Sequence, residues 1–245
     1  SINTLMLVKE VISNYNLAEG PNDPHIFKAI FLAGGPGSGK GFVVDSMMGA
    51  DATGLKIVNS DDVYEKLASL AKPKPLDLSD PEVVASPQGQ EAREKAKRLT
   101  KAKQGNYIDG RLGLIIDGTA KDVAKTADQK RKLEQLGYDT MMVFVNTNLD
   151  MAQKRNKMRP RQLPEEMIEK MWHAVQDNMM KFQQLFGNAN FYIVDNSGGL
   201  EDPDRKENFV AVEKNIRKFV TEPPRRPQAK SWLADQQQSR ANSDK

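Results

Sequence analysis

Gly34-Gly35-Pro36-Gly37-Ser38-Gly39-Lys40-Gly41 sets five glycines around a single lysine. Glycine suits such a loop because its backbone adopts conformations that other residues disfavour, so that successive amide groups point at phosphate oxygens. An apolar run typical of a buried strand, residues 29–33, precedes the loop, and residues 42–48 are able to continue as a helix. Strand, glycine loop and helix together predict a phosphate-binding P-loop, in which Lys40 supplies a positive charge to the outer phosphates.

The sequence beyond this loop alternates between apolar runs and helical patterns. Strands are expected over residues 29–33, 56–58, 112–117, 140–145 and 191–194, and helices over residues 60–70, 90–104, 122–136, 149–158, 164–186 and 206–220. Five strands separated by helices favour an α/β fold of P-loop NTPase type, with a parallel sheet covered by helices on both faces.

Segments at both ends fall outside this alternation. We expect an N-terminal extension over residues 1–27, a P-loop domain over residues 28–220 and an extended tail over residues 221–245. Within the domain, four prolines mark residues 71–90 as an irregular insertion, and residues 155–164 are a candidate lid.

The tail is too polar to bury the apolar surface that folding requires, so we expect it to be ordered only against a partner. Trp232 and Leu233 form its one apolar anchor. The extension and the tail together indicate attachment to a larger protein assembly.

The composition excludes several kinds of site. With no cysteine, the 245-residue chain has neither disulfides nor thiolate metal ligands, and we interpret its two histidines, His25 and His173, as packing or surface residues. A net charge of +3 is too small to indicate a nucleic-acid or membrane partner. The absence of cysteine fits a reducing, cytoplasmic setting. No apolar run approaches the roughly 20 residues that span a bilayer, so we expect a soluble protein.

The residues after Lys40 depart from the general P-loop pattern. Gly41 stands where a magnesium-binding serine or threonine is usual, and Phe42 has no hydroxyl group either. Either Ser38 or water holds the ion instead, or the site is impaired; both interpretations stay open. We assign the whole loop, with Gly41 and Phe42, to nucleotide binding.

Two aspartates follow predicted strands. Asp61 lies 21 residues after Lys40, where a parallel sheet places it beside the phosphate crevice, and its carboxylate is a candidate catalytic base. The competing interpretation is that Ser60, Asp61 or Asp62 caps a helix. Asp117 ends the most apolar strand and is a candidate magnesium residue, although a buried aspartate bonded to a loop amide would fit the same position.

Basic side chains cluster after the fourth strand. Arg155 and Arg159, accompanied by Arg161, are candidates to contact the transferring phosphate, because the planar guanidinium group suits phosphate oxygens. The alternative is a solvated helix face. For the basic run over residues 90–104 we favour a solvated face over the binding of a polyanionic acceptor.

These motifs resemble those of the P-loop kinase group that includes zeta toxins, polynucleotide kinases and, more distantly, adenylate kinases. The loop resembles that of adenylate kinases, which also place glycine after the lysine but follow it with threonine. Zeta toxins and polynucleotide kinases place an aspartate base after the second strand, and zeta toxins have an acidic-Gly-Thr stretch that is similar to Asp117-Gly118-Thr119.

The resemblance implies an ATP-dependent phosphotransferase that uses Mg²⁺, with Lys40, Asp61, Arg155 and Arg159 as its catalytic residues and Asp117 near the metal. It leaves open whether the acceptor is a nucleotide-sugar, a nucleotide or a polynucleotide 5′ end. The two extensions match none of these families. They suggest a phage-encoded protein, located in the host cytoplasm or the virion. Gly41 and these extensions instead favour the alternative, a nucleotide-binding structural or assembly module without kinase activity.

Overall fold

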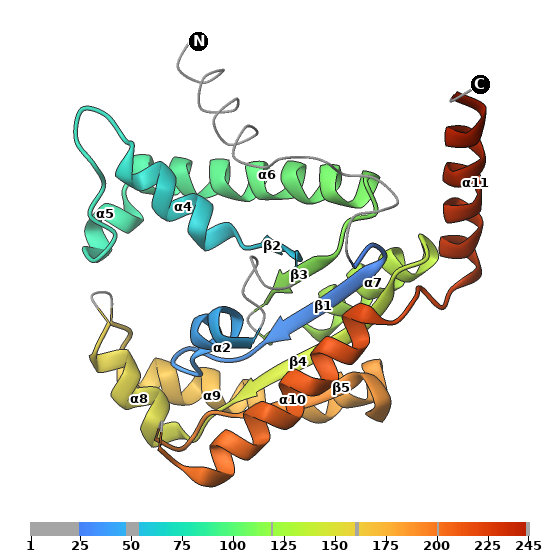
Figure 1. Cartoon of the computed structure of the whole chain (residues 1–245). Helices are drawn as coiled ribbons and strands as arrows, with labels where there is room; N and C mark the ends of the chain where they lie inside the picture. The colour runs from blue at the N-terminus through green and yellow to red at the C-terminus, as the bar shows by residue number, and fades with distance from the viewer. Residues whose placement is uncertain (1–24, 48–53, 119, 160–161, 200, 244–245) are drawn as a thin grey trace.

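Five parallel strands form one sheet in the order β2-β3-β1-β4-β5 (Figure 1). The strands are β1 Lys28–Ala33, β2 Lys56–Val58, β3 Leu114–Asp117, β4 Asp139–Asn146 and β5 Phe191–Asp195. This computed structural model describes residues 25–47, 54–118, 120–159, 162–199 and 201–243. The five-stranded parallel sheet and the α/β fold expected from the sequence are confirmed.

Helices connect the strands and cover the sheet. They are α2 Lys40–Met47, α4 Ser60–Ser69, α5 Pro81–Ala85, α6 Pro87–Asp109, α7 Val123–Gln135, α8 Leu149–Lys157, α9 Glu165–Phe186, α10 Pro203–Thr221 and α11 Pro227–Ser243, with a short 3-10 turn over Asn188–Asn190. The side chains of α7 and α9 pack on one face of the sheet and those of α2 and α10 on the other.

Residues 29–33 of β1 are apolar on both faces of the strand because helices cover both. Along β1, Phe31 points into the layer that contains Phe182 of α9, whereas Ile30 and Leu32 point into the layer that contains Ile216 of α10. All three β1 side chains are at most 3% exposed. A strand between two helical layers therefore reads as an unbroken apolar run, as residues 29–33 do.

The register of the sheet places the ends of β1 and β3 side by side. Leu32 pairs with Asp117, so the acidic end of β3 lies next to the P-loop that follows β1. β2 pairs with β3 on its other side, and its end leads directly into α4. Parallel strands thus deliver three consecutive strand ends to one edge of the sheet.

The prediction of an extended tail over residues 221–245 is wrong, because residues 227–243 form helix α11, which projects from the body (Figure 1). Ala229 is fully buried, and Trp232 and Leu233 pack against the core beside Phe27. The prediction used the average polarity of the segment, which does not show that Ala229, Trp232 and Leu233 lie on one side of a helix. The anchor expected at Trp232 is confirmed.

Two other segments are placed as follows. Residues 71–80 form an irregular loop, but the insertion expected over residues 71–90 ends earlier, because α5 and the first turn of α6 occupy its second half. Asp80 and Ser86 cap these helices. The N-terminal extension lies outside the described residues except for its last three, and His25 there contacts the carbonyl of Val220 through Nδ1 at 2.7 Å.

Candidate active site

The P-loop joins the end of β1 to the start of α2 and has the backbone that its glycines permit. Gly37 and Gly39 have φ angles of 72° and 85°, in the left-handed region that favours glycine. A side chain at Gly37 would also meet the carbonyl oxygen of Ala152, at 2.5 Å from its Cβ. The loop is therefore fixed both by conformation and by close packing against α8.

Lys40 lies where charges from several elements converge. Its ammonium group donates a 2.8 Å hydrogen bond to the carbonyl of Gly34. Burial lowers the pKa of Lys40, whereas the nearby carboxylates of Asp117 and Asp61 oppose that change and Arg159 adds to it. The structure thus brings Lys40, Asp61, Asp117 and Arg159, which lie far apart in the sequence, to one place.

Asp61 lies on the first turn of α4 without capping it. The cap is Asn59, whose side-chain oxygen accepts a 2.8 Å hydrogen bond from the Asp61 amide, so the capping role considered for Ser60, Asp61 or Asp62 belongs to another residue. The Asp61 side chain is 69% exposed, and one of its oxygens lies 3.8 Å from Arg93. Its carboxylate is therefore accessible to an acceptor.

Asp117 is partly buried at the end of β3. Its Oδ2 accepts a 3.2 Å hydrogen bond from Asn59, and its Oδ1 is buried with no hydrogen-bond partner among the described residues. Burial raises the pKa of Asp117, and the charges of Asp61 and Asp62 raise it further, whereas the ammonium of Lys40 and the backbone amide of Gly118 oppose this. A cation bound beside this carboxylate would favour its ionised form.

Arg155 lies beneath the P-loop. Its Nη1 donates to the carbonyls of Gly37 and Ser38 at 3.2 and 3.3 Å, and its Nη2 donates to the carbonyl of Asn196 at 2.8 Å. Burial lowers the pKa of Arg155, and the charge of Arg205 lowers it further. With these contacts, Arg155 holds the backbone of the loop. This position differs from the lid position that the sequence led us to expect for Arg155.

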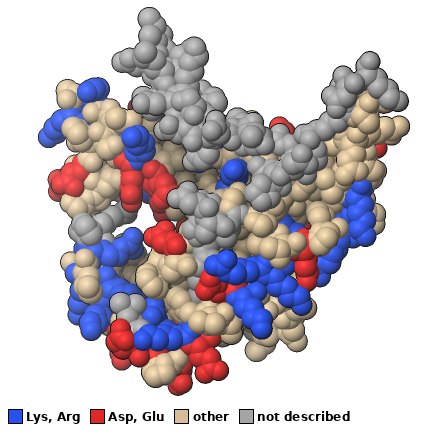
Figure 2. Space-filling model, in the orientation of Figure 1, with Lys and Arg blue, Asp and Glu red and all other residues tan. Residues whose placement is uncertain are grey.

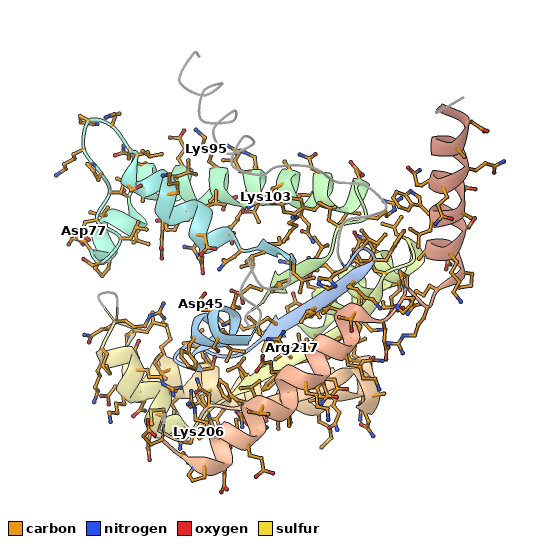
Figure 3. All side chains as sticks on the ribbon, in the orientation of Figure 1. Asp45, Asp77, Lys95, Lys103, Lys206 and Arg217 are labelled. Carbon is orange, nitrogen blue, oxygen red and sulfur yellow. The ribbon has the colours of Figure 1, made fainter. Side chains whose placement is uncertain are left out.

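Arg159 is exposed after the end of α8, near enough to Lys40 for their charges to interact. Residues 160–161 of the candidate lid, Arg161 included, lie outside the described residues. Figure 2 shows basic side chains over α8 across a hollow from acidic side chains over α2 and α4. Asp45 extends from α2 toward this hollow (Figure 3), and its charge raises the pKa of Asp62, after burial and Asp61.

The residues that could hold magnesium have the oxygen donors that this ion prefers. The hydroxyl of Ser38, a side chain only 2% exposed, is buried with no partner among the described residues, as is Asp117 Oδ1. Gly41 and Phe42 add no oxygen, and the ring of Phe42 packs on α10 instead. The described residues contain no group of three His, Cys, Asp or Glu suited to a metal, but magnesium typically takes one or two protein oxygens together with phosphates and water.

Sequence reasoning missed Asn59 and Asn196. Asn59 contacts Asp62 and Asp117, and Asn196 donates a 2.7 Å hydrogen bond to the carbonyl of Ser38. The signal for Asn59 was its place directly before a helix, but Asn196 lies 158 residues from its partner and belongs to no motif.

A pocket of about 490 Å³ opens beside this site, at the end of β5 and the start of α10. Asn148, Asp195, Ser197, Asp202 and Arg205 are among its lining residues. A second pocket, of about 430 Å³, lies at the opposite edge of the sheet and includes Asp139 and Arg226. No helix in the described part of the chain is long and apolar enough to cross a membrane.

Comparison with protein families gives one match, the zeta toxin family, over residues 21–208. Comparison with curated protein sequences finds no match. A solved structure of the PezAT toxin–antitoxin system of Streptococcus pneumoniae is similar, with a TM-score of 0.56 at 16% identity over 89% of this chain and 96% of that chain.

The complex AvrRxo1-ORF1:AvrRxo1-ORF2 has the same fold. Its structure with sulphate ions gives a TM-score of 0.54 at 11% identity, over 85% of this chain and 76% of that chain. Its structure with ATP gives 0.53 at 13% identity, over 82% and 65%. At these identities the similarity establishes the architecture alone.

Proposed function

This chain belongs to the zeta toxin family, and on that basis we propose that it is an ATP-dependent phosphotransferase that phosphorylates a hydroxyl group. The observation that carries the proposal is the convergence of Lys40, Asp61 and Asp117 at the ends of β1, β2 and β3. A phosphate-binding loop, a carboxylate base and a further carboxylate are the parts that such a transfer needs.

The reaction that this arrangement supports is in-line transfer of the γ-phosphoryl group. Asp61 accepts the proton of the acceptor hydroxyl as its oxygen forms a bond to the γ-phosphorus, and the bond from that phosphorus to the β–γ bridging oxygen breaks to release ADP. Lys40 and Arg159 offset the negative charge on the phosphate oxygens. The exposed carboxylate of Asp61 is accessible for this role.

Magnesium fits the oxygen donors of Ser38 and Asp117, whose Oγ and Oδ1 are buried without a hydrogen-bond partner in the described part of the chain. Held by Ser38 and Asp117, the ion would neutralise part of the negative charge of the phosphates. Asp117 has a raised pKa because burial disfavours its charge, so a cation beside it would favour the ionised carboxylate.

The acceptor is proposed at the level of class only: a nucleotide-sugar, a nucleotide or a polynucleotide 5′ end. The two similar structures include a toxin–antitoxin system and a two-protein complex, which supports a protein partner for this chain as well. The cytoplasmic location and the phage origin stay predictions. Family membership favours transfer over the alternative of a module that binds nucleotide without catalysis.

The test is transfer of labelled γ-phosphate from magnesium-ATP to UDP-N-acetylglucosamine, nucleoside monophosphates and oligonucleotides with 5′ hydroxyls. We expect labelling of one acceptor class, its loss in Lys40→Ala, and its loss with ATP binding retained in Asp61→Asn. The matched control is Asp62→Asn, which removes the neighbouring carboxylate and is expected to keep transfer. Full transfer by Asp61→Asn would remove Asp61 from the role of base, and ATP binding without transfer to any acceptor would favour the non-catalytic module.

A further inference from the structure

A buried polar network supports the P-loop from the side opposite the phosphates. Asn196, only 2% exposed after β5, donates through Nδ2 to the carbonyl of Ser38 at 2.7 Å. Its Oδ1 accepts a 3.0 Å hydrogen bond from Nε of Arg205, which is 7% exposed on α10. The amide of Asn196 thus relays a contact from α10 to the loop backbone.

The bond to Ser38 determines where the next amide points. A trans peptide is planar, so its carbonyl and its N–H point in opposite directions. Because Asn196 and Arg155 both donate hydrogen bonds to the Ser38 carbonyl, the N–H of Gly39 faces away from these two side chains. That direction is the one in which a P-loop amide meets phosphate oxygens.

Close packing at Gly39 shows that this contact constrains the sequence of the loop. A Cβ at Gly39 would lie 2.2 Å from Nδ2 of Asn196, so the network and any larger side chain at this position exclude each other. The glycine is therefore needed for its φ of 85° and also for the approach of Asn196.

Arg205 is itself held by aromatic rings. Its guanidinium carbon lies 4.4 Å from the ring centre of Phe209 and 5.3 Å from that of Phe42. Phe42 lies on the first turn of α2, two residues after Lys40, so its ring links the cation on α10 to the helix that follows the loop. Cation–π contacts of this kind favour a charged side chain in a partly desolvated place.

We propose that Asn196 and Arg205 are positioning residues that orient the Ser38–Gly39 peptide toward the nucleotide phosphates, with Phe42 as the anchor of Arg205. The inference rests on the proposed function, because it requires that the P-loop bind ATP. It also gives a role to Phe42, which stands two residues beyond the lysine without a hydroxyl: its ring supports the loop through Arg205.

The test is the Kd of magnesium-ATP, measured by calorimetry at fixed ionic strength and well below the unfolding temperature. Asn196→Ala and Arg205→Ala should each weaken binding about tenfold, which corresponds to about 1.4 kcal/mol. The double variant should weaken it little more than the stronger single variant, because both act through one chain of contacts. Arg205→Lys, which keeps the charge, should restore part of the affinity, whereas Asn196→Asp should not, because a carboxylate cannot donate to the Ser38 carbonyl.

Two controls separate positioning from general stability. Val212→Ala removes a side chain buried between α10 and the sheet and so destabilises the same helix without touching the loop. Arg217→Ala removes an exposed arginine of α10 (Figure 3). Both should bind ATP like the wild type.

Unchanged ATP affinity in folded Asn196→Ala and Arg205→Ala would overturn the inference and leave the proposed function standing. Losses in the double variant that equal the product of the single losses would overturn it as well, and so would an equal loss in Val212→Ala. If the wild-type chain bound no ATP, the proposed function and the inference would fall together.

Discussion

Asn59 Nδ2 donates a 3.2 Å hydrogen bond to Asp117 Oδ2 and thereby links the end of β2 to the end of β3. The same nitrogen lies 3.2 Å from Asp62 Oδ1, and the side-chain oxygen accepts from the Asp61 amide. One neutral side chain therefore contacts three acidic residues beside the P-loop. Asn59 bonds to the backbone amide of Asp61 and not to its carboxylate, so the carboxylate stays available to act as a base.

Replacement of Asn59 should affect stability and transfer together. Asn59→Ala removes the N-cap of α4, which should lower the free energy of unfolding by about 1 kcal/mol. It also removes the hydrogen bond that orients Asp117, so we expect kcat for phosphate transfer to fall about tenfold or more, by analogy with lost supporting contacts at metal ligands. Urea unfolding and steady-state kinetics measure the two effects.

The control for this variant is Asp122→Ala. Asp122 caps α7 through a 2.9 Å bond from the amide of Lys125, and its charge is not among those that shift the pKa of Lys40 or Asp117. It should lose similar stability and keep full transfer. Equal kinetic losses in both variants would show that Asn59 acts through the stability of the fold alone.

Asp117→Asn should make the protein more stable at neutral pH while it impairs transfer. Burial raises the pKa of Asp117 above its unfolded value, so the folded state binds the proton more tightly and ionisation costs stability at a pH above the folded pKa. Asparagine mimics the neutral form and still accepts a hydrogen bond from Asn59. The gain should shrink as the pH falls through the folded pKa and should vanish below the unfolded pKa of roughly 3.9, where both states are protonated.

The measurement is urea unfolding of the wild type and Asp117→Asn at several pH values, without nucleotide or magnesium. Asp128→Asn is a suitable control, because hydrogen bonds and the positive charges of Lys132 and Arg131 lower the pKa of Asp128 on the exposed face of α7. That change should not stabilise the protein. An Asp117→Asn variant less stable than the wild type at neutral pH would show that the ionised carboxylate is compensated in the folded state.

The fold, the P-loop and the two aspartates that follow strands were predictable from the sequence. The P-loop is one uninterrupted stretch, and Asp61 and Asp117 follow apolar strands whose ends must meet at one edge of a parallel sheet. In the structure the charges of both carboxylates act on Lys40. Local pattern and sheet geometry together are enough for such residues.

The remaining residues depend on contacts that no local pattern records. Asn196 and its partner Ser38 are 158 positions apart in the sequence. Arg155 contacts the backbone of the loop instead of forming a lid over it, and this follows from how α8 packs. The tail was mispredicted for another reason: docking of α11 depends on the fit of Trp232 against Phe27, which average polarity does not describe.

Trp232→Ala should test whether α11 belongs to the folded domain. The ring of Trp232 packs on Phe27 with centroids 5.4 Å apart, and loss of this partly buried side chain should lower the free energy of unfolding by about 2 kcal/mol. ATP affinity should not change, because the contact lies at the edge of the sheet remote from the P-loop. The exposed Gln237→Ala is the control. If amide protection across residues 227–243 is absent in the wild type, the helix is not docked in solution.

Arg155 and Arg159 should differ in the step that each affects. Arg155 donates to the carbonyls of Gly37 and Ser38, so Arg155→Lys, which keeps the charge but loses the fork of donors, should raise the Kd for ATP severalfold. Arg159 is exposed and interacts with Lys40 only through charge, so Arg159→Ala should lower kcat with a nearly unchanged Kd, as expected when a contact forms mainly in the transition state. Calorimetric Kd values and steady-state rates for both variants separate the two roles. The reverse pattern would place Arg159 in nucleotide binding and return Arg155 to the transferring phosphate.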